Sequence, residues 1–182
     1  IAALALPRLL EQVSDRPVML AGGVGLVAGL AALSLAPIGQ GAGWWTFLAI
    51  WFVLGLAYSG VLTPVGRLLR RSSHKEDRPA LFAAQFALSH ACWLITYPLA
   101  GWLGGALGLS VTAGILAVLA GAGAALAVLA WPRSDPEVLV HVHDDLPADH
   151  PHVQDARATD RGLEHAHTYV IDEHLARWPD QP

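Results

Sequence analysis

The stretch PVMLAGGVGLVAGLAALSLAPIGQGAGWWTFLAIWFVLGLAYSGVLTPVG, residues 17–66, contains no Asp, Glu, Lys or Arg. Residues 79–132 form a second block that lacks the same four residue types. Each block is about twice as long as one membrane-spanning helix requires. Because the bilayer interior offers no water to unpaired backbone groups, helices are the simplest structure for such blocks. The sequence therefore predicts two helical hairpins in lipid.

The composition agrees with a bilayer as the solvent. Of 182 residues, 54% are hydrophobic and 14% charged, and the mean hydropathy is +0.44, which is too apolar for an ordinary soluble domain. The net charge of -4 is unevenly spread, since most acids follow Pro132. An acidic end argues against nucleic acid as a partner. Cys92 is the single cysteine, so no internal disulfide forms.

The glycine-rich middle of each block divides it into two helices. Residues 1–10 are too short to span the membrane, so we interpret them as the end of a helix that begins before this chain, which makes the chain a fragment of a longer protein. The predicted fold is an all-α membrane protein, a bundle of about four complete transmembrane helices plus a partial one, with a largely disordered cytoplasmic tail. The predicted helices lie near 18–37, 43–66, 80–106 and 109–131; the predicted domains are the bundle, 1–131, and a His-rich acidic tail, 132–182.

Basic residues alternate between the predicted connections. Arg8 and Arg16 precede the first complete helix, and a cluster follows the second one, whereas the two remaining connections have no basic residue. By the positive-inside bias, the basic connections and the tail lie in the cytoplasm. The cluster comprises Arg67, Arg70, Arg71, Lys75 and Arg78.

Two of the helices carry most of the polar residues, and we predict that they line a transport pathway. The alternative is that these side chains only hydrogen-bond within the bundle, at about 0.6 kcal/mol per contact. His90 is the strongest candidate, because ionisable groups at membrane depth often mark ion paths. The candidates are Tyr58, Ser59, Thr63, Gln85, Ser89 and His90.

The stretch YSGVLTPVGRLLRRSSHKEDRPALFAAQFALSHACWLITYPLAGWLG, residues 58–104, resembles the tenth helix, basic cytoplasmic loop and eleventh helix of a major facilitator superfamily transporter. The resemblance extends over residues 1 to about 131 and implies alternating access together with an N-terminal half that this chain lacks. Ser14-Asp15-Arg16-Pro17 then falls in the loop between helices eight and nine, although Glu11 stands where glycine is usual. The resemblance implies gate or loop-contact roles for Asp15, Arg16, Arg67, Arg70 and Arg71.

Seven of the nine histidines lie in the acidic tail, six of them in His-x-His pairs. Side chains two positions apart on an extended chain point to the same side, so each pair is suited to hold one ion. Imidazole and carboxylate favour Ni²⁺, Co²⁺ or Zn²⁺, and metal binding is expected to order a segment that cannot fold alone. The predicted metal ligands are His141, His143, His150, His152, His165, His167 and His174.

Two interpretations of the tail stay open. It is a metal-binding segment, or a solvated acidic tail whose histidines are incidental. We also expect the more apolar segments Thr168-Tyr-Val-Ile and Leu175-Ala-Arg-Trp178 to dock on the cytoplasmic face of the bundle.

The tail is similar to the histidine-rich C-terminal ends of bacterial nickel and cobalt resistance exporters of this superfamily. That resemblance implies a multi-pass protein of the bacterial inner membrane that exports divalent metal; the alternative is an exporter of an organic solute or drug. No cofactor is required by either. An enzyme is not expected, because the chain has no phosphate-binding Gly-Lys loop, no His-Glu-x-x-His and no plausible catalytic triad.

Overall fold

The computed structural model describes residues 13–36, 43–132, 136, 138–144 and 146–171. The predicted helix stub, Arg8, His174 and the segment from Leu175 to Trp178 lie outside these residues. Four of the described helices are long and apolar enough to cross a membrane. The predicted bundle of about four complete transmembrane helices is therefore confirmed.

The helix boundaries agree with the local sequence. Helix α2, Asp15–Leu35, starts directly after Ser14 and stops before Pro37, which disfavours a helical conformation in the residue ahead of it. Gly108 is the single residue between α5, Arg78–Leu107, and α6, Leu109–Ala130. It has a φ of 82°, a conformation that glycine adopts without steric cost, so the chain reverses there within one residue.

The second predicted helix is divided by a proline. Helix α3 comprises Gly43–Leu62, and the short helix α4, Val65–Arg71, follows it with Pro64 at its N-cap. Proline has no N–H and its ring opposes a continuous helix, so the break at Thr63 and Pro64 has a direct cause. Pro98 lies inside α5 without interrupting it.

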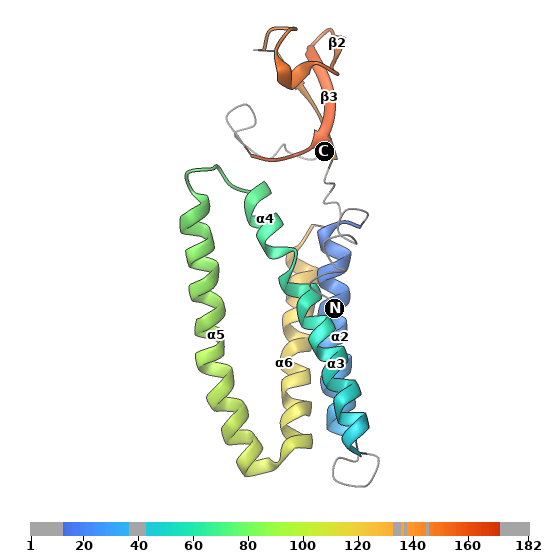
Figure 1. Ribbon diagram of the computed structural model, residues 1–182, viewed down its shortest axis with the longest axis vertical. Helices are drawn as coiled ribbons and strands as arrows, with labels where there is room; N and C mark the ends of the chain where they lie inside the picture. Colours follow the sequence, from blue (N-terminus) through green and yellow to red (C-terminus); the bar gives the residue numbers. More distant parts are fainter. Residues whose placement is uncertain (1–12, 37–42, 133–135, 137, 145, 172–182) are drawn as a thin grey trace.

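Glycines on α2 allow close helix packing. Helix α2 packs against both α3 and α6, whereas α5 contacts mainly α6 and α4 and stands apart from the other long helices (Figure 1). A Cβ added to Gly22 would lie 2.7 Å from the carbonyl oxygen of Ala57, and one added to Gly25 would lie 2.9 Å from the Ala57 Cβ. Small residues at helical spacing therefore join α2 and α3.

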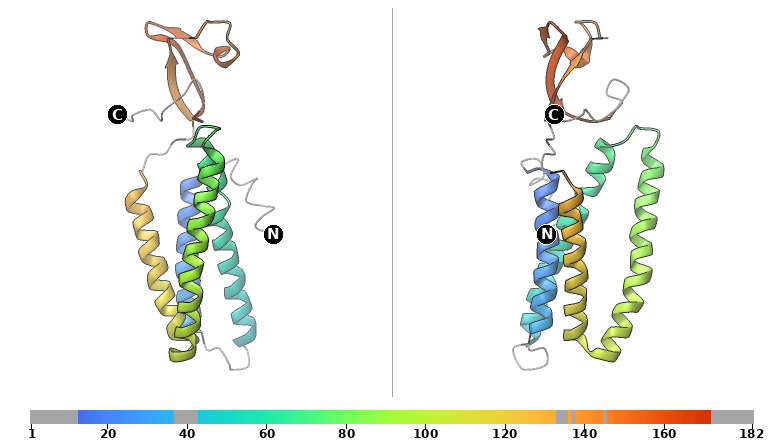
Figure 2. Two further views of the ribbon diagram at one scale, coloured as in Figure 1. Left: turned by 90° about the vertical axis from the view of Figure 1, so that its left-hand side faces the viewer. Right: turned by 180° about the vertical axis from the view of Figure 1, so that it is seen from behind.

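The tail contains a small β-sheet, so the prediction of a largely disordered tail is wrong for its described part. Strands β1, Val138–His143, β2, Arg157–Thr159, and β3, Gly162–Thr168, form an antiparallel sheet in the order β1-β3-β2, with the short 3-10 helix η1, Pro151–Val153, beside it. The sheet lies at the end of the bundle where α4 lies (Figure 2).

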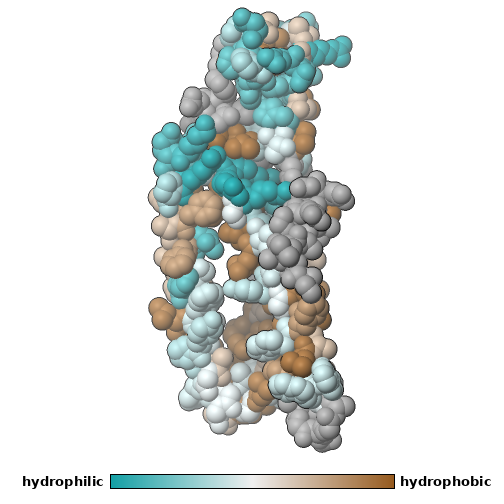
Figure 3. Space-filling model, viewed as in Figure 1, coloured by the Kyte–Doolittle hydropathy of each residue, from teal (hydrophilic) through white to brown (hydrophobic). Residues whose placement is uncertain are grey.

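The alternating sequence VLVHVH favours a strand for β1, with the three valines on its exposed face and Leu139, His141 and His143 on the other. Val153 and Tyr169 are 3% exposed and His143 4% exposed, so imidazoles take part in a core that the apolar residues alone would not form. Strongly hydrophilic residues gather over this sheet and around α4, while the long helices show a mixture of hydrophobic and intermediate residues on this face (Figure 3).

Candidate functional site

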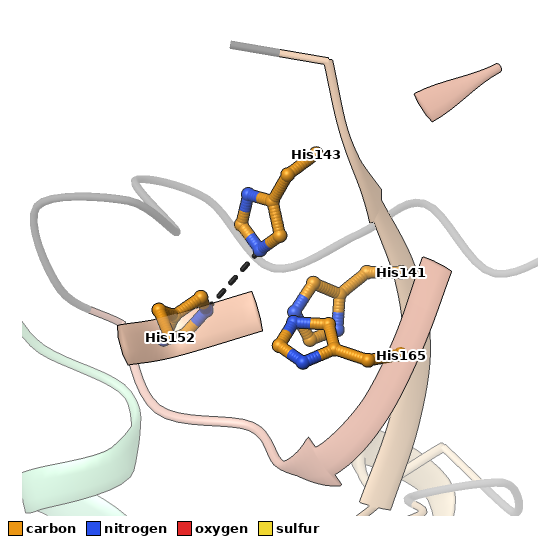
Figure 4. A group of neighbouring side chains, drawn as sticks. All are labelled: His141, His143, His152 and His165. Atoms are coloured by element: carbon orange, nitrogen blue, oxygen red, sulfur yellow. Dashed lines mark hydrogen bonds between the residues drawn. The ribbon is translucent and has the colours of Figure 1, made fainter. Parts of the chain in front are cut away.

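Four histidines from three elements of the tail converge on one point. They are His141 and His143 of β1, His152 of η1 and His165 of β3, and each offers a ring nitrogen within 4.8 Å of the others (Figure 4). Strand alternation places the first two on one face of β1, as the His-x-His spacing predicts. Antiparallel pairing then sets His165 directly opposite His141, with ring centroids 4.5 Å apart.

His152 reaches the group from outside the sheet. Its Nε2 lies 3.1 Å from the Nε2 of His143 (Figure 4). The Nδ1 of His150 accepts a hydrogen bond from the backbone N–H of His152 at 3.2 Å, which caps η1. The structure therefore gives the two members of this His-x-His pair different positions, one in the group and one capping the helix beside it.

His167 borders the group, and hydrogen bonds to backbone carbonyls orient both His167 and His141. The Nδ1 of His167 donates to the carbonyl of Thr168 at 2.8 Å, and the Nδ1 of His141 donates to the carbonyl of Leu139 at 3.2 Å. Such bonds leave the lone pair on Nε2, the arrangement that metal-binding histidines commonly show. The Nε2 atoms of His165 and His167 are buried without a hydrogen-bond partner among the described residues.

The electrostatics of the group favour the neutral form of His165. Burial, followed by the neighbouring histidines with His141 first, lowers the pKa of His165 from 6.5 to about 4. At neutral pH this side chain therefore has the protonation state that a metal ligand requires.

The geometry of the group suits one divalent ion. Four nitrogens at about 2.0–2.1 Å from a tetrahedral metal are separated from one another by about 3.3 Å. Nitrogens now within 4.8 Å of one another would have to approach by at most about 1.5 Å to reach that spacing, a change that small side-chain rotations can supply. Among the described residues, no Asp or Glu joins this group. The sequence prediction of mixed imidazole and carboxylate ligands on separate pairs thus differs from the observed convergence of histidines alone.

The basic loop residues lie at the same end of the bundle as the tail. Arg67 of α4 forms a salt bridge of 2.7 Å with Asp15 of α2, whose side chain is 1% exposed, while Arg16 follows on the first turn of α2. The Nε of Arg70 donates to the carbonyl of Gly66 at 3.1 Å. Arg71 is buried at the end of α4.

A cavity of about 670 Å³ lies between the four long helices. Its lining is almost entirely apolar, and Tyr58, Tyr97 and Thr112 are the hydroxyl-bearing residues among those that line it. Tyr58 is the predicted pathway residue that lines this cavity; Ser59, Thr63, Gln85, Ser89 and His90 do not. Helices α2 and α6 contribute to the lining as well as α3 and α5, although few polar residues in α2 and α6 indicated this.

Two of the remaining polar candidates, Ser89 and His90, bond within their own helix. Ser89 donates from Oγ to the carbonyl of Phe86 at 2.9 Å, and His90 donates from Nδ1 to the same carbonyl at 2.8 Å. The His90 ring also lies against Phe86 and Trp93, with centroid distances of 3.8 and 4.6 Å. Local bonding of this kind explains how an imidazole is accommodated in an apolar segment.

Comparison with known proteins identifies the membrane part. No curated protein and no solved structure matches the chain significantly. Residues 1–150 match the protein family described as the Major Facilitator Superfamily, whose members are transporters. The matched range includes the four membrane helices and strand β1. The chain therefore belongs to the Major Facilitator Superfamily.

Proposed function

We propose that this chain forms the C-terminal part of a secondary-active exporter of divalent metal ions, and that its tail binds the metal in the cytoplasm. The observation that carries the proposal is the convergence of His141, His143, His152 and His165 within 4.8 Å. Histidines scattered by chance along a solvated tail have no reason to meet in this way. Neutral imidazoles favour borderline cations such as Zn²⁺, Ni²⁺ and Co²⁺.

The direction of transport in this proposal follows from orientation. If the connection with Arg67, Arg70 and Arg71 faces the cytoplasm of a bacterial cell, the tail faces it too. A tail that collects ions on that side serves export. Alternating access then requires pairing with an N-terminal half of the same transporter.

The first experiment measures metal binding by the complete transporter, purified with a histidine-free affinity tag. Wild type is expected to bind one Zn²⁺, Ni²⁺ or Co²⁺ per protein in a competition titration. Replacing both His143 and His165 by Ala should weaken binding by more than about 100-fold, because even changes outside the ligand shell commonly cost 10–100-fold. His74→Ala is the matched control, since His74 lies in the connection between α4 and α5. A wild-type protein that binds no metal contradicts the proposal.

A second candidate function, export of an organic solute, is favoured by the cavity. Its lining is almost entirely apolar, a surface that suits an amphiphilic molecule better than a hydrated cation. Vesicle transport assays that compare Ni²⁺ and Co²⁺ with a panel of amphiphilic dyes separate the two functions. Dye transport that is unaffected by the His143 and His165 double substitution would assign the tail no part in transport.

A further inference from the structure

We propose that metal bound at the histidine site controls the docking of the tail on the C-terminal end of α4, and thereby the position of this short helix. The inference rests on the proposed metal site and adds a regulatory role to it. Its basis is a direct contact between the tail and the bundle. The backbone N–H of Ile171 donates to the backbone carbonyl of Arg71 at 3.0 Å.

This contact satisfies an acceptor that α4 cannot satisfy itself. Arg71 is the last residue of α4, and the last carbonyls of a helix have no intrahelical donor. The preceding carbonyl, that of Arg70, accepts from Nη2 of Arg78 at 3.0 Å. The tail therefore caps α4 together with the first residue of α5. Losing the tail contact would remove this donor from the Arg71 carbonyl, in a region where Arg71 and Ser73 are buried.

A short segment joins this contact to the histidines. Strand β3 ends at Thr168, and Tyr169 and Val170 are all that separates it from Ile171. The Tyr169 side chain is 3% exposed, and its ring lies edge-on to that of His141 with a centroid distance of 5.6 Å. An ion held by His141 and His165 would fix β1 against β3 and hold Tyr169 in place. The Ile171 N–H would then be held at α4.

Helix α4 has the properties of an element that can move. It has seven residues and is separated from α3 at Pro64. The salt bridge between Arg67 and Asp15 ties it to the start of α2. Its position is therefore set by a few specific contacts at the cytoplasmic end rather than by a long packed surface. An additional contact that depends on metal changes the balance among its positions.

Thermodynamic linkage predicts how strongly metal binding and the contact between Ile171 and Arg71 affect each other. If metal strengthens the contact between Ile171 and Arg71, breaking that contact must weaken metal binding by the same factor. Coupling between two sites is commonly 5–150-fold. Ile171→Pro removes the N–H donor and leaves every histidine in place, whereas Ile171→Ala keeps the N–H and serves as the matched control. Insertion of two glycines after Val170 loosens the connection without changing any donor, in case the proline variant fails to fold.

The experiment uses the complete transporter in nanodiscs with Zn²⁺ as the probe. Zn²⁺ affinity and hydrogen exchange over residues 65–73 are measured for each variant. Zn²⁺ is expected to slow exchange there by about tenfold in wild type and in Ile171→Ala. In Ile171→Pro and in the glycine insertion this slowing should be lost, and Zn²⁺ should bind at least about fivefold more weakly with unchanged stoichiometry.

The outcomes distinguish this inference from the proposed function. Equal affinity and equal slowing of exchange in all variants overturn the coupling and leave the metal site standing. Zn²⁺ binding in wild type without any change of exchange over residues 65–73 also overturns it. Absence of Zn²⁺ binding in wild type overturns the metal site itself, and the regulatory role with it.

Discussion

The carboxylate of Asp15 lies 2.7 Å from the guanidinium of Arg67, although 52 positions separate the two residues in sequence. The pair joins the first turn of α2 to α4 at the end of the bundle where the tail lies. The Asp15 side chain is 1% exposed and that of Arg67 34% exposed, so the partly covered pair is screened less by salt than a surface pair.

Replacing Asp15 by Ala is expected to destabilise the transporter by about 1–3 kcal/mol, because a partly buried cation loses its acceptor. Thermal unfolding of the purified protein measures the effect. Exchanging the two charges, with Asp15→Arg and Arg67→Asp together, should recover part of the loss. Asp77→Ala is the control, since Asp77 is an exposed acid at the start of α5. Equal stability of the Asp15 and Asp77 variants would contradict a structural role for the pair.

Gly22→Ala is expected to disturb the contact between α2 and α3, because its Cβ would lie 2.7 Å from the carbonyl oxygen of Ala57. Relieving this clash requires α2 and α3 to separate, which loses the close packing that small residues provide. Gly121→Ala is the matched control: a Cβ there meets nothing within 4 Å, and alanine has the higher helix propensity by about 1 kcal/mol. Thermal unfolding should show a lower midpoint for the first variant and no decrease for the second.

Much of the membrane part is predictable from sequence, and the tail is not. Long stretches without charge allow few structures in lipid, and Gly108 and Pro64 mark a turn and a break for reasons of backbone geometry. The tail depends on pairing between distant residues. Nothing in the local sequence indicates that His165 faces His141, or that His150 caps η1 while His152 joins the group. The lining of the cavity by α2 was also unpredictable, because apolar side chains give no signal that distinguishes a cavity from lipid.

The metal-free sheet is expected to lose stability as the pH falls from about 6.5 to about 4. The folded sheet lowers the pKa of His165 to about 4, chiefly by burial, so over this range the unfolded tail binds a proton that the folded tail does not. Stability therefore rises with pH through this window and is fully present above it. Hydrogen exchange of residues 162–168, corrected for intrinsic rates, measures the effect at pH 7.5 and 5. A His165→Asn variant should show a weaker dependence; an unchanged dependence would assign it to other groups.

The orientation of the tail can be tested with single cysteines in a Cys92→Ser background. Leu107→Cys lies at the end of α5 away from α4, and Gln154→Cys lies on the exposed surface of the tail (Figure 1). A membrane-impermeant maleimide should label the first in intact cells and the second only after lysis. Labelling of Gln154→Cys in intact cells would reverse the orientation and remove the basis for export.

Gly162 is expected to support the proposed metal site although it offers no ligand. It begins β3 with a φ of 127°, and an added Cβ would collide with the backbone carbonyl of His143. An alanine here costs about 1–3 kcal/mol in backbone strain alone, and the collision pushes β3 away from β1. Since 1.4 kcal/mol corresponds to a factor of ten, Gly162→Ala should weaken Zn²⁺ binding by about tenfold or more. Competition titration against a chromophoric chelator measures the change.

Asp160→Ala, in the same turn and exposed, should leave the affinity within about twofold, because its removal alters neither the φ requirement nor the contact with His143. Wild-type affinity in Gly162→Ala would mean that the ion is held by histidines that do not depend on the sheet.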